Sequence, residues 1–127
     1  MELDVHVQAG GTKYVIDFKS GFGSNEKGNT NRLLLVASIY RNLEREDYRC
    51  VMFVRQKEAE NNHYLLTLKK SGLWEVSCGH EAYEGIRKLS GFDIQAWVRK
   101  HVDWRNDLSG ETLQELESRQ LTQYLRW

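Results

Sequence analysis

The sequence predicts an α/β protein with a mixed central sheet flanked by helices. Three observations support this fold class: an alternating, hairpin-like pattern near the N-terminus, a broad apolar helix pattern after it, and a short continuous apolar run at Cys50–Val54. A strand, a helix and a buried strand in succession are typical of a right-handed crossover between parallel strands. We expect residues 1–127 to form a single domain, because this length is enough to bury one core.

The N-terminal hairpin is predicted from its glycine pair and its alternation. Its expected strands are Leu3–Gln8 and Thr12–Phe18, with Gly10 and Gly11 at the turn, because the favoured two-residue turns need positive φ. Alternation then gives the hairpin two faces. The apolar face, which we expect to point to the core, carries Leu3, Val5, Val7, Tyr14, Ile16 and Phe18. The polar face carries Glu2, Asp4, His6, Gln8, Lys13, Val15, Asp17 and Lys19.

A long helix is predicted after the hairpin, from a cap at Asn29 or Thr30 to about Glu44. A short side-chain oxygen at such a position satisfies the free backbone N–H groups of a helix start. The wide arc of apolar side chains on this helix predicts that it is largely buried. Cys50–Val54 is then expected to form a central strand covered on both faces, with Cys50 as a buried thiol.

The second half of the chain is predicted to contain another hairpin and three helices. His63–Leu68 and Leu73–Ser77 are the expected strands of that hairpin. The helices are expected at about His80–Leu89, Ile94–Val102 and Thr112–Leu125. We expect Gly91 to end the first of them, and Asp93 and Ser109 to cap the other two.

The polar face of the first hairpin brings two carboxylates together. With the turn at the glycine pair, Asp4 lies opposite Asp17, and Glu2 lies opposite Lys19. Opposed carboxylates repel unless a cation or a proton separates them, and Mg²⁺ is commonly held by one or two carboxylates together with substrate phosphate. Lys19 points to the same side as Asp17 and can orient a water or balance charge on a phosphate. This group suits metal-assisted hydrolysis of a phosphodiester; the alternative is an amphipathic hairpin with charges on its solvent face.

The residues Asp4 and Tyr14-Val15-Ile16-Asp17-Phe18-Lys19 resemble the signature of the PD-(D/E)XK nuclease superfamily. That superfamily includes restriction endonucleases, archaeal Holliday-junction resolvases and repair nucleases. The resemblance implies that Asp4 and Asp17 bind Mg²⁺, which Mn²⁺ is expected to replace, and that Lys19 orients the attacking water. It also implies that the carbonyl of Phe18 is a further metal ligand.

The resemblance further implies a restriction-endonuclease-like core of the αβββαβ type. In that family a helix precedes the first acidic residue, whereas only three residues precede Asp4 here. We therefore expect the core to lack its first helix, and the chain to be a fragment, a catalytic domain or a subunit of a larger enzyme. The position before Asp4, a proline in the family signature, is Leu3 in this chain.

The function that the resemblance implies is a Mg²⁺-dependent DNA endonuclease of the restriction-enzyme type. Its expected partners are DNA and either a second copy of the chain or a separate recognition domain or subunit. Two alternatives stay open: a Holliday-junction resolvase or repair nuclease that recognises DNA shape, and a noncatalytic DNA-binding or assembly domain that retains the nuclease fold. His6, Lys27 and Arg32 are candidate contacts to a DNA phosphate, with an ordinary polar surface as the alternative.

The composition and the remaining motifs narrow the function classes. The chain has no apolar run of membrane-spanning length and opens with no signal-peptide pattern, so we expect a cytoplasmic protein without membrane association. Cys50 and Cys78 form no C-x-x-C pair, and the scattered histidines lack the spacing of a zinc site. Neither a P-loop motif nor a G-x-S-x-G motif occurs. The formal net charge of zero argues against a broad basic surface.

Overall fold

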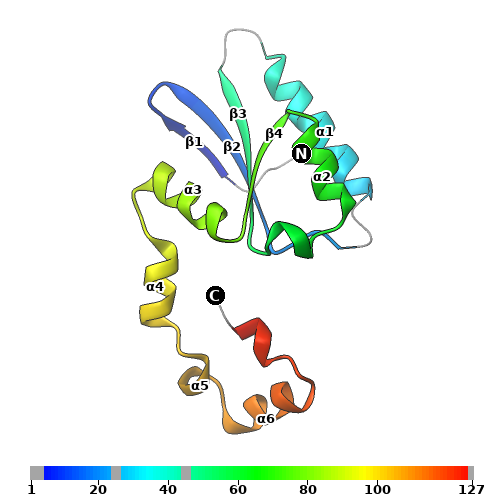
Figure 1. Ribbon diagram of the computed structural model, residues 1–127. Helices are drawn as coiled ribbons and strands as arrows, with labels where there is room; N and C mark the ends of the chain where they lie inside the picture. The colour runs from blue at the N-terminus through cyan, green and yellow to red at the C-terminus, as the bar shows by residue number, and fades with distance from the viewer. Residues whose placement is uncertain (1–4, 24–26, 44–46, 126–127) are drawn as a thin grey trace. The chain divides into compact units, whose positions relative to one another are not determined.

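The computed structural model describes residues 5–23, 27–43 and 47–125. The chain forms two compact units, residues 1–91 and 92–127, and each is described by itself. The first unit contains a four-stranded sheet with the strand order β1-β2-β3-β4 (Figure 1). The strands are β1 (Val5–Ala9), β2 (Thr12–Lys19), β3 (Tyr48–Val54) and β4 (Trp74–Cys78). Because β1 is antiparallel to β2 while β2, β3 and β4 are parallel, the sheet is mixed, as the sequence predicts.

The predicted hairpin and its register are confirmed over the described residues. Val5 pairs with Ile16 and Ala9 pairs with Thr12, which is the register that a turn at the glycine pair requires. Gly10 and Gly11 have φ of 57° and 85°, a conformation that side chains other than glycine rarely adopt. Residues 1–4 lie outside the described part of the chain, so the predicted pairs of Asp4 with Asp17 and of Glu2 with Lys19 stay predictions.

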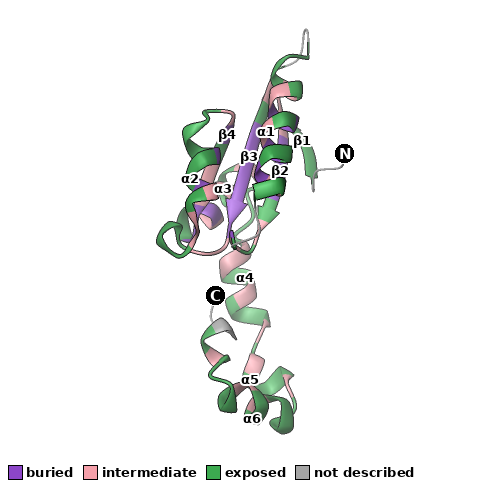
Figure 2. Ribbon diagram, turned by 90° about the vertical axis from the view of Figure 1, so that its right-hand side faces the viewer, coloured by how far each residue is buried: buried purple, intermediate pink, exposed green. Residues whose placement is uncertain are grey.

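Helices cover both faces of the sheet. On one face, α1 (Lys27–Arg41) and α2 (His63–Lys70) bury the larger part of the core, and α3 (His80–Ser90) packs on the other face (Figure 1). The strand β3 lies between these layers and is buried along most of its length (Figure 2). The larger cluster of buried residues comprises Val15, Phe22, Leu33, Val36, Ala37, Cys50, Met52, Val54, Leu65, Leu68, Trp74 and Cys78. The smaller one comprises Ile16, Val51, Phe53 and Ala82.

The prediction of a strand at His63–Leu68 is wrong, because these residues form helix α2. Asn62 caps the helix by accepting a hydrogen bond from the backbone N–H of Tyr64 at 3.0 Å. Leu65 and Leu68, three residues apart, lie on one helical face and are fully buried. The predicted strand at residues 73–77 is confirmed as β4, but α2 connects it in parallel to β3 instead of forming a hairpin.

The prediction that the face of Tyr14, Ile16 and Phe18 points to the core is confirmed only for the smaller cluster, which contains Ile16 and is packed by Tyr14. Val15, on the opposite face, is completely buried in the larger cluster, whereas Ile16 belongs to the smaller one. Both crossover helices pack on the Val15 face, and α3 covers only part of the other. Phe18 therefore stays 43% exposed, and Val5 and Val7 of the same face are exposed as well.

The long helix differs from its prediction at its start and in its burial. It begins at Lys27, so neither Asn29 nor Thr30 is its cap, and Thr30 is a buried residue of the first turn. It ends at Arg41, before the predicted end at about Glu44, because Asn42 and Leu43 already lie outside the helix. The apolar arc is only half covered: Leu33 is fully buried, whereas the large side chains Leu35, Ile39 and Leu43 are exposed. Helix α1 therefore presents an apolar stripe to solvent instead of being largely buried.

The second unit is helical, and its capping residues are those predicted. It contains α4 (Ile94–His101), α5 (Trp104–Asp107), α6 (Gly110–Ser118) and a 3₁₀ helix, Thr122–Leu125. Asp93 accepts a hydrogen bond from the backbone N–H of Ala96, and Ser109 accepts one from Thr112. Gly91, with φ of 72°, ends α3 as expected. The single helix predicted at 112–125 is interrupted, because Gln120 adopts a φ of 57°.

No described helix combines the length and the apolar character needed to cross a lipid bilayer.

The burial of α1 predicts opposite outcomes for two nearby leucines. Leu33 is 0% exposed and Leu35 is 57% exposed. Leu33→Ala leaves a cavity in the larger core cluster, so we expect it to lower the free energy of unfolding by about 2–5 kcal/mol. Leu35→Ala removes an exposed side chain from the same helix, so we expect a change within about 0.5 kcal/mol. Urea denaturation of the two variants measures both values, and similar losses would contradict the packing described for α1.

Candidate active site

Asp17 is a buried carboxylate near the carboxyl end of β2. It is 3% exposed and pairs in register with Met52 of the central strand β3. It lies on the same face of β2 as the buried Val15, beneath the layer formed by α1 and α2. Burying a carboxylate costs several kcal/mol unless charges or hydrogen bonds compensate it. A carboxylate at such a position therefore indicates a specific electrostatic environment.

Lys19 supplies part of that environment. Its Nζ lies 3.5 Å from Oδ2 of Asp17, and its side chain is 24% exposed. The two residues are two apart on β2, so the strand itself directs both side chains to the same face. The structure thus brings together two of the three residues predicted to be catalytic. The third, Asp4, lies outside the described residues.

The predicted metal ligands are hard oxygen atoms, which suit Mg²⁺. Among the described residues no group of three or more His, Cys, Asp or Glu side chains gathers as a metal site. The predicted set needs only two carboxylates and the carbonyl of Phe18. The carbonyl of Lys19 accepts a hydrogen bond from the N–H of Arg55, next to β3, at 2.9 Å. Because carbonyls alternate along a strand, that of Phe18 is directed to the side of β1, the strand that Asp4 precedes.

The predicted phosphate contacts are His6 on β1 and Lys27 and Arg32 on α1. His6 is exposed on β1 opposite Val15, and its Nε2 is 3.4 Å from the hydroxyl oxygen of Tyr40 on α1. The rings of His6 and Tyr40 also form an edge-on contact, so His6 is a packing partner of α1. Lys27 and Arg32 are exposed residues of the first half of α1. No described contact joins either of them to Asp17 or Lys19.

The segment after β2 is fixed by residues that follow β3. The N–H of Gln56 donates to the carbonyl of Ser20 at 3.0 Å. Phe22 is held twice: its N–H donates to Oδ1 of Asn61 at 2.7 Å, and its carbonyl accepts from the N–H of Asn62 at 3.3 Å. The side-chain amide of Asn62 also donates to the carbonyl of Gly23. These contacts order the backbone directly beyond Lys19.

Sequence reasoning missed the role of the two asparagines. An Asn directly before a stretch with helical spacing is a capping signal, and Asn62 before Leu65 and Leu68 fits it. That signal was sufficient to place α2. The contact of Asn61 with Phe22 joins segments 39 residues apart and has no local signal.

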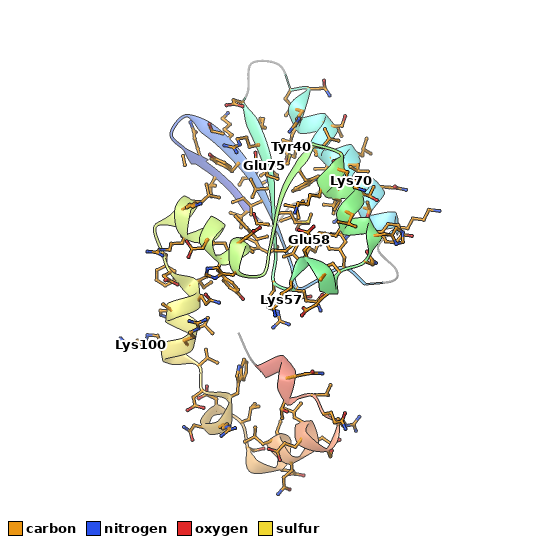
Figure 3. The ribbon with its side chains drawn as sticks, in the orientation of Figure 1. Tyr40, Lys57, Glu58, Lys70, Glu75 and Lys100 are labelled. Carbon is orange, nitrogen blue, oxygen red and sulfur yellow. The ribbon has the colours of Figure 1, made fainter. Side chains whose placement is uncertain are left out.

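Asp17 and Lys19 lie towards the end of the sheet where the carboxyl ends of the parallel strands meet. β2, β3 and β4 are parallel and therefore end at the same edge. Lys57, three residues beyond the end of β3, lies at this end of the sheet, whereas Glu75 lies towards the other end (Figure 3).

The cysteines take no part in the candidate site. Cys50 is buried in β3, as the sequence predicts, and burial raises the pKa of its thiol to about 11. Burial also raises the pKa of the Cys78 thiol. Both cysteines are free, and protonated buried thiols are poor nucleophiles and poor metal ligands.

Comparison with known proteins found no match to the chain among family models, curated proteins or solved structures.

The ion pair of Asp17 and Lys19 predicts an energetic coupling between these residues. Lys19→Met removes a positive charge close to a buried carboxylate, so we expect it to destabilise the parent chain. In an Asp17→Asn background the same change is expected to cost less, with a coupling of about 0.5–3 kcal/mol. Urea denaturation of the four proteins at pH 7 gives the coupling. Additive effects of the two substitutions would show that the pair does not interact.

Proposed function

We propose that this chain is the catalytic part of a Mg²⁺-dependent DNA endonuclease of the restriction-enzyme type. The observation that carries the proposal is the pair formed by Asp17 and Lys19, a buried carboxylate 3.5 Å from a partly exposed lysine near the carboxyl end of β2. The arrangement acidic-x-Lys on a strand is the one that the resemblance to PD-(D/E)XK nucleases implies. The confirmed register of the hairpin supports Asp4 as the first acidic residue of the signature, with Asp17 as the second.

Each residue has a stated part in the proposed site. Asp4, Asp17 and the carbonyl of Phe18 would hold the metal ion, with Mn²⁺ able to replace Mg²⁺. The ion would stabilise negative charge on the scissile phosphate. Lys19, fixed at the end of β2, orients the attacking water and adds positive charge at the phosphate.

The burial of Asp17 favours a catalytic domain over a noncatalytic one. A domain used only for binding or assembly has no need for a carboxylate that is 3% exposed within a sheet, since an apolar residue at this position removes the desolvation cost. The presence of both Asp17 and Lys19 is explained if the pair takes part in phosphodiester hydrolysis. A second copy of the chain would supply the second catalytic site for cutting both strands, and a separate recognition domain or subunit would supply sequence selectivity.

The proposed activity predicts metal-dependent nicking of supercoiled plasmid DNA. The parent chain is expected to nick in Mg²⁺ or Mn²⁺ and to be inactive without a divalent metal. Asp17→Ala is expected to lower the nicking rate at least a hundredfold, because it removes a metal ligand. Agarose gels that separate supercoiled from open-circular plasmid measure both rates.

A matched control is Glu75→Gln. Glu75 is an exposed carboxylate on β4 that forms an ion pair with Arg49 at 2.5 Å. It pairs in register with Val51, on the face of the sheet opposite to that of Asp17. Its loss is expected to leave nicking unchanged. Equal nicking by the parent and by Asp17→Ala, or nicking that does not require a divalent metal, would refute the proposed function.

A further inference from the structure

Gly21, two residues beyond Lys19, provides space for the side chain of Gln56. A Cβ atom built at Gly21 would lie 1.6 Å from Oε1 and 2.4 Å from Cδ of Gln56. The φ of Gly21 lies outside the left-handed region, so the backbone conformation does not demand glycine there. The amide of Gln56 occupies the volume that any side chain at position 21 would need.

The backbone around Gln56 is held between all three parallel strands. Its N–H donates to the carbonyl of Ser20, beyond β2, at 3.0 Å. Its carbonyl accepts a hydrogen bond from the N–H of Gly79, beyond β4, at 3.1 Å. The N–H of Gly79 also donates to Val54, the last residue of β3. Gln56 is therefore fixed where the carboxyl ends of β2, β3 and β4 meet.

This position is next to the proposed catalytic pair. Lys19 pairs in register with Val54, and Gly21 and Gln56 follow these two residues by the same two steps. Their contact thus continues the pairing of β2 with β3 just beyond Lys19. Lys57, the residue after Gln56, is labelled in Figure 3 at the end of the sheet where the parallel strands end.

The side-chain amide of Gln56 has hydrogen-bonding capacity that no described contact uses. The residue is only half-buried, and among the residues that the structure describes its side chain makes no hydrogen bond. A carboxamide offers two N–H donors, and glutamine amides are common partners of phosphate oxygens in complexes with nucleic acid.

We propose that the amide of Gln56 donates a hydrogen bond to a phosphate oxygen of the bound DNA, and that residue 21 is glycine so that this amide can lie beside Lys19. The inference rests on the proposed nuclease function and adds a substrate contact to it. Gly21 acts through Gln56 and is a positioning residue.

The proposal predicts that Gly21→Ala and Gln56→Ala have the same effect and that the two are not additive. Gly21→Ala displaces only the far end of a flexible side chain, so the fold is expected to be kept. Each substitution alone is expected to raise KM for plasmid nicking about tenfold, as for the loss of a hydrogen bond to a charged group, with kcat changed less than about threefold. The double variant is expected to match the single ones.

Gly23→Ala is the matched control, because a Cβ at Gly23 meets no atom within 4 Å and its φ lies outside the left-handed region. It is expected to keep the parent KM. Gln56→Glu, which has nearly the same shape but places a negative charge beside the phosphate, is expected to raise KM further than Gln56→Ala. Thermal unfolding of each variant verifies that the fold is intact.

The outcomes separate this inference from the proposed function. If the parent nicks DNA but Gln56→Glu keeps the parent KM, Gln56 is no substrate contact. Additive effects of Gly21→Ala and Gln56→Ala would overturn the role of Gly21. If the parent neither nicks plasmid nor binds a short DNA duplex, the proposed function fails, and with it the ligand assigned to Gln56.

Discussion

The parallel pairing of β2 with β3 is the constraint on which both the core and the candidate site depend. It extends from Lys13 opposite Tyr48 to Lys19 opposite Val54. The connection between the two strands places α1 on one face of the sheet, and that face is the one that carries Val15 and Asp17. The same pairing, continued beyond Lys19, brings Gln56 to Gly21. A buried carboxylate, a nearby lysine and the amide of Gln56 thus occupy one end of the sheet because two strands lie side by side.

Local patterns were sufficient to predict the elements that local physics determines. The glycine pair and the alternation of the hairpin predicted its register, because a tight turn leaves one way to pair the strands. The proximity of Asp17 and Lys19 followed from their separation by two residues on one strand. His63–Leu68 was mistaken for a strand because a short apolar run does not distinguish a strand from a helix; the capping residue Asn62 was the informative signal.

Features that depend on contacts distant in sequence were not predictable. Alternation sorts the residues of β2 into two faces, but it does not say which face the helices will cover, and the apolar face proved to be the less covered one. For the same reason Gln56 was not recognised. Its importance depends on the contact with Gly21, 35 positions earlier, and no local motif marks either residue. The catalytic residues predicted from the sequence all lie in one hairpin, whereas the structure extends their surroundings to the ends of β3 and β4.

The central claim is that Asp17 and Asp4 together bind a divalent metal, and calorimetric titration of Mn²⁺ into the full chain tests it most directly. The parent is expected to bind Mn²⁺, and both Asp17→Asn and Asp4→Asn are expected to lose that binding, since each removes a charged oxygen ligand while keeping the side-chain shape. Glu75→Gln is expected to bind like the parent. Binding of Mn²⁺ with the same affinity in the parent and in both Asp variants would contradict the account.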